Sequence, residues 1–386
     1  MTNRMLPEHA LPSWRRAVLK VGSNLLAADG GGLTPQYAEA LAAFITASHA
    51  ANREVVLVSS GAVAAGRALL RERTAVGPEL AARQALAALG QAPMIALWQR
   101  LSERPVAQVL LTHDDLRNRR RYLNARATLR ELLTLGVLPV VNENDTVAVD
   151  ELKLGDNDNL AAIVAALVDA DLLLIASDVD ALYNADPRRD ASAQPIGHVP
   201  QLTPQIIAMA GGSGTHVGTG GMRTKLQAAE KAAAAGIPTA IFSGRNADTV
   251  KRLEADCLRG TLIDVSGNRM QARKYWLRHA PSGSGRVTID AGAVRALAGG
   301  RASLLPGGIL EVTGEFHRGD LVDILDAGDR PVARGLCQYG AAEVRRVAGR
   351  HSRDIATVLG YSYGAEIVHR DDLATLIDSH TGEQEA

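Results

Sequence analysis

Short apolar segments recur along the first two thirds of the chain, and they are continuous rather than alternating in polarity. Residues 54–59, Glu-Val-Val-Leu-Val-Ser, are typical, and a helical pattern begins soon after them, near Val63. A strand that is apolar at nearly every position is buried on both faces, as happens in parallel sheets covered by helices. We therefore predict an α/β fold, a three-layer sandwich around a mostly parallel sheet. The other predicted strands are residues 17–22, 106–111, 137–141, 172–175 and 239–242.

The pattern changes at residues 281–285, Pro-Ser-Gly-Ser-Gly, which have the composition of a linker. Short β-like segments follow, separated by Gly and Asp turns. We predict an α/β domain over residues 1–280, a small, mainly β domain over residues 281–378 and a disordered polar tail over residues 379–386. The β-like segments are residues 286–289, 308–312, 321–325 and 332–336.

Composition limits the class of protein. The 42 basic and 42 acidic residues cancel, so bulk charge draws the chain toward neither nucleic acid nor membrane. Cys257 and Cys337 lie far apart without CxxC spacing, which argues against a disulfide framework or a zinc site. No segment approaches the ~18 apolar residues of a membrane span, and the first residues lack the apolar core of a signal peptide. We expect a cytoplasmic protein.

Glycines and a lysine stand at the ends of the first two predicted strands, where ligands bind in parallel sheets. Residues 20–23 read Lys-Val-Gly-Ser and residues 59–62 read Ser-Ser-Gly-Ala. Glycine lets backbone amides approach an anion, and the following helix adds a favourable dipole. Each glycine alone could also serve only a tight turn, but a lysine at such a strand end favours an anion site.

A second glycine cluster opens an alanine-rich helical pattern. Residues 218–225 read Gly-Thr-Gly-Gly-Met-Arg-Thr-Lys, so their amides could cradle a phosphate and Lys225 could supply charge. The segment is not a Walker A loop, because no GxxxxGK[ST] occurs in the chain. A surface loop is the alternative interpretation.

Residues 142–159, NENDTVAVDELKLGDNDN, follow a predicted buried strand. They form no EF-hand loop, because Leu160 stands where the third calcium ligand belongs, and they lack zinc ligands. Spacing alone leaves open a carboxylate pair for glycoside hydrolysis, or a polar loop whose Asp156 or Asn157 caps a helix beginning near Leu160. A pocket for a small zwitterion is the better interpretation, because carboxylates there meet an ammonium group and amides meet a carboxylate.

Taken together, these motifs closely resemble those of the glutamate 5-kinases, a branch of the amino acid kinase family with a C-terminal PUA domain. The resemblance covers nearly the whole chain. It implies ATP-dependent phosphorylation of the side-chain carboxylate of L-glutamate to L-glutamyl 5-phosphate, the first step of proline biosynthesis. One departure lies at residues 177–183, Ser-Asp-Val-Asp-Ala-Leu-Tyr, where the family commonly has Thr-Asp and then Gly before Leu-Tyr. The matching segments are residues 20–23, 59–62, 142–145, 155–159 and 219–225.

The resemblance also implies roles for single residues. Lys20 and Lys225 would bind and neutralise the transferring phosphoryl group, and Asp158 would orient both lysines. Gly22 and Gly61 would form phosphate-binding turns. The implied glutamate-binding residues are Ser60, Asp145 and Asn157, and the implied ATP-binding residues are Lys20, Ser177, Asp178, Thr219, Gly220, Gly221, Met222, Arg223, Thr224 and Lys225.

The same resemblance implies cofactors and partners. Mg²⁺ would be held mainly by the ATP phosphates, with no metal site built from protein ligands. The nucleophile, a carboxylate, is ionised at neutral pH, so the reaction would rest on positioning and charge neutralisation without a general base. We expect feedback inhibition by proline near the glutamate site, functional coupling to glutamyl phosphate reductase because the acyl phosphate is labile, and a homo-oligomer, a dimer or a tetramer.

Two rival functions were compared with this one. PUA domains are common in RNA-modifying proteins, but residues 284–370 hold 11 arginines and no lysine against 10 acidic residues, far from the basic footprint of an RNA binder. Aromatic residues make up 3% of the chain, which leaves few stacking platforms, so we expect no nucleic acid partner. The nearer rival is a family member acting on aspartate, acetylglutamate, carbamate or UMP, and residues 142–159 favour glutamate.

Overall fold

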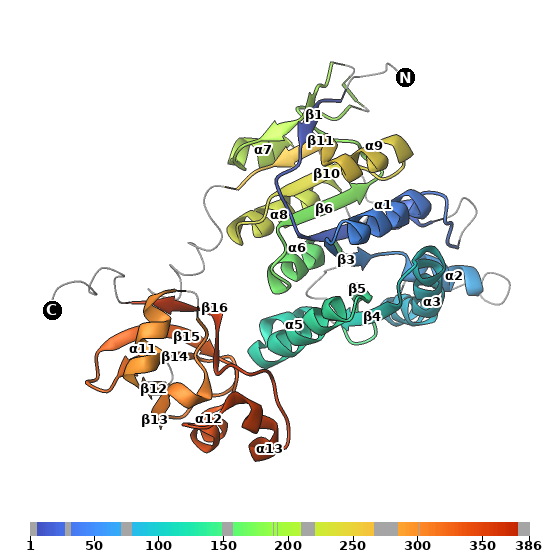
Figure 1. Cartoon of the computed structure of the whole chain (residues 1–386). Helices are drawn as coiled ribbons and strands as arrows, with labels where there is room; N and C mark the ends of the chain where they lie inside the picture. The colour runs from blue at the N-terminus through green and yellow to red at the C-terminus, as the bar shows by residue number, and fades with distance from the viewer. Residues whose placement is uncertain are drawn as a thin grey trace. The chain divides into compact units, whose positions relative to one another are not determined.

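A computed structural model of the chain describes residues 6–27, 32–70, 79–148, 157–187, 189–190, 192–209, 221–265, 285–300 and 302–376 (Figure 1). Contacts group the chain into two compact units, residues 1–118 with 128–267, and residues 119–127 with 268–386. The predicted domain boundary at residue 280 and the predicted tail at residues 379–386 lie outside the described residues.

One large sheet organises the first unit. Its strands are β1 (Glu8–Ala10), β2 (Arg16–Val21), β3 (Glu54–Ser59), β4 (Val106–Leu111), β5 (Leu138–Glu143), β6 (Leu172–Ser177), β9 (His198–Val199), β10 (Thr239–Ser243) and β11 (Cys257–Ile263). The order is β1-β11-β10-β6-β2-β3-β5-β4, with β9 beside β11. Neighbours from β10 to β4 are all parallel, whereas β11 is antiparallel to β1 and β10. The predicted mostly parallel sheet is confirmed.

Helices cover both faces of this sheet (Figure 1). Helices α1 (Ala38–Ala50) and α9 (Ala247–Arg252) pack on one face, and α6 (Asn157–Leu167) and α8 (Met222–Ala234) pack together on the other. None of the helices within the described ranges is long and apolar enough to cross a membrane. The remaining elements are η1 (Ser23–Leu25), α2 (Ala62–Leu69), α3 (Leu80–Leu101), α4 (His113–Arg117), α5 (Arg119–Thr134), β7 (Leu182–Tyr183), β8 (Pro195–Ile196), α7 (Pro204–Met209) and η3 (Leu253–Ala255).

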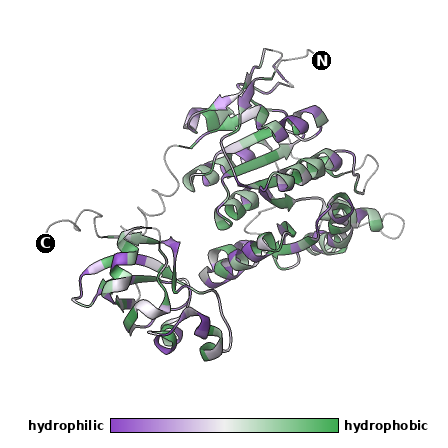
Figure 2. Ribbon diagram, in the orientation of Figure 1, coloured by the Kyte–Doolittle hydropathy of each residue, from purple (hydrophilic) through white to green (hydrophobic). Residues whose placement is uncertain are grey.

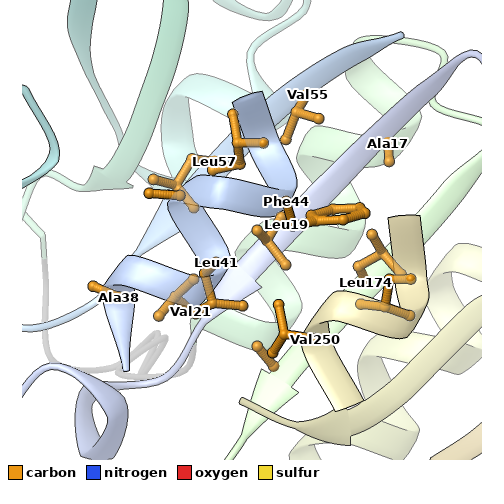
Figure 3. Packing of buried hydrophobic residues seen from close by; sticks show 14 of the residues in the cluster. Ala17, Leu19, Val21, Ala38, Leu41, Phe44, Val55, Leu57, Leu174 and Val250 are labelled. Carbon is orange, nitrogen blue, oxygen red and sulfur yellow. The ribbon is translucent and has the colours of Figure 1, made fainter. Parts of the chain in front are cut away.

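Side-chain alternation along β2 decides which residues reach which face. Ala17, Leu19 and Val21 lie in the hydrophobic core with Phe44 of α1 (Figure 3). The strands of this sheet are coloured mainly as hydrophobic in Figure 2, in keeping with burial on both faces. Because alternate side chains point to opposite faces, Lys20 extends to the other side, where α6 and α8 lie.

Two glycines allow α2 and α3 to pack in backbone contact. A Cβ at Gly90 would lie 1.7 Å from the carbonyl oxygen of Ala62, and a Cβ at Gly66 would lie 1.9 Å from that of Leu86. Both obstacles are backbone atoms, which cannot rotate away. This contact fixes the start of α2 against α3. Because α2 begins two residues after Ser60, the turn that carries Ser60 is fixed as well.

We expect Gly90→Ala to lower the free energy of unfolding by about 1–3 kcal/mol or more, because the added methyl group must push two helices apart. Urea unfolding measures the loss. The control is Ala88→Ser, an exposed position of the same helix, which should change the free energy by less than ~0.5 kcal/mol. Equal unfolding midpoints for Gly90→Ala and the unmodified protein would contradict the close approach.

The second unit contains a five-stranded sheet of order β13-β12-β14-β15-β16. Its neighbours are antiparallel except for β12 and β14. In the same unit, Arg126 of α5 is buried and its Nη1 donates to both carboxylate oxygens of Asp372, over 3.0 and 2.9 Å. The predicted small, mainly β domain is confirmed. Its elements are β12 (Gly285–Ile289), α11 (Ala291–Ala298), η4 (Pro306–Gly308), β13 (Ile309–Gly314), β14 (Leu321–Asp326), β15 (Pro331–Cys337), α12 (Ala341–Val347), η5 (Ser352–Asp354), α13 (Ile355–Leu359) and β16 (Val368–Thr375).

Candidate active site

Three buried charged side chains meet between the sheet and the helices α6 and α8. Asp158, in the first turn of α6, has one carboxylate oxygen 2.5 Å from Lys20 Nζ and the other 3.0 Å from Lys225 Nζ. Lys20 comes from the end of β2, and Lys225 comes from the first turn of α8. The three residues, which are far apart in the sequence, therefore form one site at the carboxyl ends of the parallel strands.

The electrostatics of this group favour an anion. Asp158 is fully buried, and Lys20 and Lys225 are 5% and 3% exposed. Burial alone would raise the pKa of Asp158, but the charges of the two lysines outweigh it and lower that pKa to about 2. Two ammonium groups and one carboxylate carry a formal charge of +1, so a phosphoryl group beside them would be stabilised.

The N-terminus of α8 adds a second phosphate-binding feature. The Thr224 hydroxyl lies 2.9 Å from an oxygen of Asp158 and 2.8 Å from the carbonyl oxygen of Gly221, so it links the turn to the buried carboxylate. A Cβ added at Gly221 would meet no atom of the described residues within 4 Å, and a helix N-terminus of this kind favours a bound anion. Met222 and Arg223 lie in this turn, whereas the predicted Thr219 and Gly220 lie outside the described residues.

Gly22 and Gly61 occupy the two turns beside these charges. Gly61 precedes α2 with φ +109°, a left-handed conformation that a side chain would strain. Gly22 has ordinary dihedrals, but a Cβ there would lie 3.6 Å from Lys20 Nζ and fill the space beside the ammonium group. Gly61 is therefore needed for backbone shape, whereas a Cβ at Gly22 would stand only at ordinary contact distance from the Lys20 ammonium group.

A network of amides and hydroxyls lies at the neighbouring strand ends. The Asn157 side-chain nitrogen lies 2.7 Å from Ser60 Oγ and 3.0 Å from Asn142 Oδ1, and donates to both. Asn142 is buried at the end of β5, and Asn157 is the first residue of α6. These three residues, from three separate segments of the chain, form one polar network beside Asp158.

A buried tryptophan is hydrogen-bonded to the residue that precedes Ser60. Trp98 of α3 donates its indole N–H to Ser59 Oγ over 2.8 Å, and both residues are buried. Ser59 in turn donates to the carbonyl oxygen of Ser60 over 3.1 Å. The indole therefore restrains the turn that carries the Ser60 hydroxyl.

If Ser60 binds the amino acid substrate, as the sequence resemblance implies, we expect Trp98→Phe to raise the KM for that substrate about fivefold, since it removes one hydrogen bond worth about 1 kcal/mol from the Ser60 turn. The KM for the nucleotide should stay unchanged. Trp14→Phe is the matched control, because its buried indole lies in the same core but donates to Asp256 and not to Ser59. If both variants changed the two KM values alike, Trp98 would have only a structural role.

Ser177 is the last residue of β6, the strand between β2 and β10, and Asp178 follows it. Ser177 is buried and donates to one oxygen of Asp178 over 3.2 Å, and Asn24 donates to the other over 2.9 Å. Burial tends to raise the pKa of Asp178, but these hydrogen bonds and the charge of Arg245 lower it on balance. An ionised carboxylate therefore lies at the carboxyl ends of the parallel strands, next to the turn that follows Lys20.

Glu143 and Asp145 form an acidic pair just past the pocket. Burial raises the pKa of Glu143 to about 7, and the nearby Asp145 carboxylate adds to the rise. Burial also raises the pKa of Asp145, partly offset by the charge of Arg83. A cation such as an ammonium group beside these two carboxyl groups would favour their ionised forms.

The site thus brings together most residues that the sequence singled out. Lys20, Asp158 and Lys225 are in direct contact, as are Ser60 and Asn157. Helix α6 begins at Asn157, three residues before the predicted start, so Asp158 lies in its first turn. The individual roles of Asn142 and Glu143 were missed, although both stand in the polar run directly after an apolar strand.

Comparison with known proteins gives the family. Residues 15–243 match the amino acid kinase family, and residues 285–359 match the PUA domain. Glutamate 5-kinase from Xanthomonas euvesicatoria pv. vesicatoria is 67% identical over 362 residues, 93% of this chain and 100% of that protein. Glutamate 5-kinase from Xylella fastidiosa (strain M23) is 66% identical over 374 residues, 96% of this chain and 97% of that protein.

Among solved structures, carbamate kinase from Giardia lamblia bound to AMP-PNP matches with a TM-score of 0.48 and 18% identity. The match covers 65% of this chain and 99% of that one. The high identity to the glutamate 5-kinases extends over nearly the full length of both sequences. The chain therefore belongs to the glutamate 5-kinases of the amino acid kinase family and carries a C-terminal PUA domain.

Proposed function

We propose that this protein catalyses the ATP-dependent phosphorylation of the side-chain carboxylate of L-glutamate to L-glutamyl 5-phosphate, the first step of proline biosynthesis. The observation that carries the proposal is the buried group of Lys20, Asp158 and Lys225 beside the amide pocket of Asn142 and Asn157. The high identity to glutamate 5-kinases supports the same reaction.

The proposed mechanism needs charge neutralisation more than proton transfer. The side-chain carboxylate of glutamate attacks the γ-phosphorus of ATP in line with the departing ADP oxygen. Lys20 and Lys225 neutralise the phosphoryl oxygens, and Asp158 holds the two ammonium groups a fixed distance apart. The nucleophile is ionised at neutral pH, so no residue has to remove a proton from it.

The donor set fits a magnesium ion that is carried by the nucleotide. Mg²⁺ prefers phosphate oxygens and water to an all-protein cage. In the part of the chain that the structure describes, no group of three His, Cys, Asp or Glu side chains could hold a metal. Asp158, which lies nearest the lysines, is already engaged by both. When bound with ATP, Mg²⁺ would neutralise part of the negative charge of the phosphates, and the two lysines would neutralise the charge that remains.

Ser60, Asn157 and Asn142 are proposed to bind the carboxylate groups of glutamate, and Glu143 with Asp145 its ammonium group. An ammonium group beside Glu143 favours the ionised carboxylate, so glutamate binding should lower its pKa from about 7. Near pH 7 part of the Glu143 population is protonated, and binding must then release a fraction of a proton. The affinity for glutamate should accordingly rise as the pH increases through about 7.

Calorimetry of glutamate binding in two buffers of different ionisation enthalpy measures this proton release. We expect Glu143→Gln to abolish it, whereas Glu131→Gln, an exposed position on α5, should leave it unchanged. Identical proton release in the Glu143→Gln variant would mean that another group titrates on binding.

The acceptor is tested by initial rates of ADP formation with L-glutamate, L-aspartate, acetylglutamate, carbamate or UMP. Turnover with L-glutamate in large excess over the others is the expected result. A comparable or higher rate with another acceptor would leave the family unchanged and overturn the proposed role of residues 142–159.

Five further properties are part of the proposal. Proline would inhibit by competing at the glutamate pocket, so raising glutamate should restore the rate. Glutamyl phosphate reductase would consume the labile acyl phosphate. The protein would act in the cytoplasm as a homo-oligomer, a dimer or a tetramer, without nucleic acid.

A further inference from the structure

Asn24 makes a contact that joins two loops of the active site. It lies in η1, directly after the turn that follows Lys20, and its side-chain nitrogen donates to Asp178 Oδ2 over 2.9 Å. The two residues are 154 positions apart in the sequence. Asn24 is exposed, whereas its neighbour Leu25 is fully buried and anchors the turn in the core. The burial of Leu25 therefore holds the side-chain amide of Asn24 at the site.

The backbone brings the same loops together. The Gly22 amide donates to the carbonyl oxygen of Ala176 over 3.3 Å, which ties the end of β2 to the end of β6. The Gly244 amide donates to the carbonyl oxygen of Ser177 over 2.9 Å, which ties the end of β10 to the same place. Three neighbouring strands thus end beside Asp178, and Asn24 adds a side-chain link between the first two.

Each of the two carboxylate oxygens of Asp178 accepts a hydrogen bond from a neighbouring side chain. Ser177 donates to Oδ1 and Asn24 donates to Oδ2. A carboxylate that receives two hydrogen bonds has few accessible rotamers, and its remaining lone pairs point in a defined direction. Such a group can accept hydrogen bonds from hydroxyl or amino groups of a nucleoside, whereas it would repel phosphates.

We infer that Asn24 is a positioning residue for nucleotide binding: it fixes the Asp178 carboxylate to the loop that carries Lys20. The phosphate chain, held near Lys20, and the rest of the nucleotide, held near Asp178, are then bound at one set spacing. The inference rests on the proposed function in one respect, namely that Asp178 faces ATP. It assigns to Asn24 no contact with the reacting atoms.

Two variants of Asn24 distinguish the effect of losing the hydrogen-bond donor from the effect of changing the size of the side chain. Asn24→Ala removes the donor and should weaken binding of AMP-PNP, measured by calorimetry, about tenfold, the value of a hydrogen bond to a charged group at an exposed site. Asn24→Asp keeps the size but sets a second carboxylate against Asp178, so it should weaken binding more than Asn24→Ala does. The KM for glutamate should change less than twofold in both. Gln201→Ala, an exposed amide of the same unit, is the control and should bind as the unmodified protein does.

A double-mutant cycle tests whether Asn24 acts through Asp178. In an Asp178→Ala background, Asn24→Ala should cause no further loss of AMP-PNP affinity. Full additivity of the two losses, or unaltered affinity of both Asn24 variants, would overturn the inference. Non-additive losses in a protein that binds AMP-PNP but does not phosphorylate glutamate would support the inference and contradict the proposed function.

Discussion

Asp158→Asn should both destabilise the protein and remove its activity. The side chain keeps its size, so no cavity forms, but the two ammonium groups of Lys20 and Lys225 would face each other without the carboxylate between them. Breaking a buried ion pair in this way costs about 3–5 kcal/mol. The rate constant kcat should fall by at least about 100-fold, because the lysines lose their common orientation.

Urea unfolding and steady-state kinetics measure the two effects of Asp158→Asn. Glu254→Gln, an exposed carboxylate in η3, should leave both unchanged. An unfolding midpoint equal to that of the unmodified protein would contradict the buried charge group.

The pH dependence of stability gives an independent check on Asp158. Its pKa in the folded protein is about 2, below the model-peptide value of 3.8, so its contribution is fully present above pH 4 or so. That contribution is lost as the pH falls from about 4 to about 2, because protonation then favours the unfolded chain. Asp158→Asn should remove this part of the acid-induced loss.

Lys225→Met should lower kcat by about 10²–10³, the usual cost of deleting one group that stabilises charge in the transition state. Methionine fills the buried space of the lysine stem without its charge, and α8 keeps its packing. The KM for ATP should change less than kcat, because the ammonium group gains most as charge shifts during transfer.

Lys231→Met provides the matched comparison for Lys225→Met. Lys231 is exposed in the last turn of the same helix, so the substitution changes the net charge equally but leaves the site intact. Equal loss of kcat in the two variants would mean that the general charge of α8, and not the buried contact with Asp158, supports catalysis.

Much of this architecture follows from local pattern. The continuous apolar strands predicted a parallel sheet buried on both faces, and the alternation along β2 explains why Lys20 faces α6 and α8 while Leu19 enters the core. Motif resemblance then pointed to the residues now seen together. These features could be predicted because they depend on periodicity and on short stretches of sequence.

Other features depend on packing between distant segments and leave no local signal. The bonds from Trp98 to Ser59 and from Asn24 to Asp178 join positions on separate elements, and neither residue belongs to a recognisable motif. The antiparallel strand β11, which lies between β1 and β10, was also missed, because its pairing is set by tertiary contacts. The sequence pattern predicts which face of a helix or strand is buried. Which partner each polar side chain contacts depends on the whole fold.

Hydroxylamine trapping shows whether the phosphoryl group is transferred to a carboxylate, because an acyl phosphate reacts with hydroxylamine to give a hydroxamate. The protein would be incubated with ATP, Mg²⁺ and L-glutamate, with Lys225→Met and Lys231→Met in parallel. The account predicts γ-glutamyl hydroxamate in amounts that match ADP, formed by the unmodified protein and Lys231→Met and strongly reduced in Lys225→Met. ADP formation that depends on glutamate but yields no hydroxamate would contradict transfer to the side-chain carboxylate.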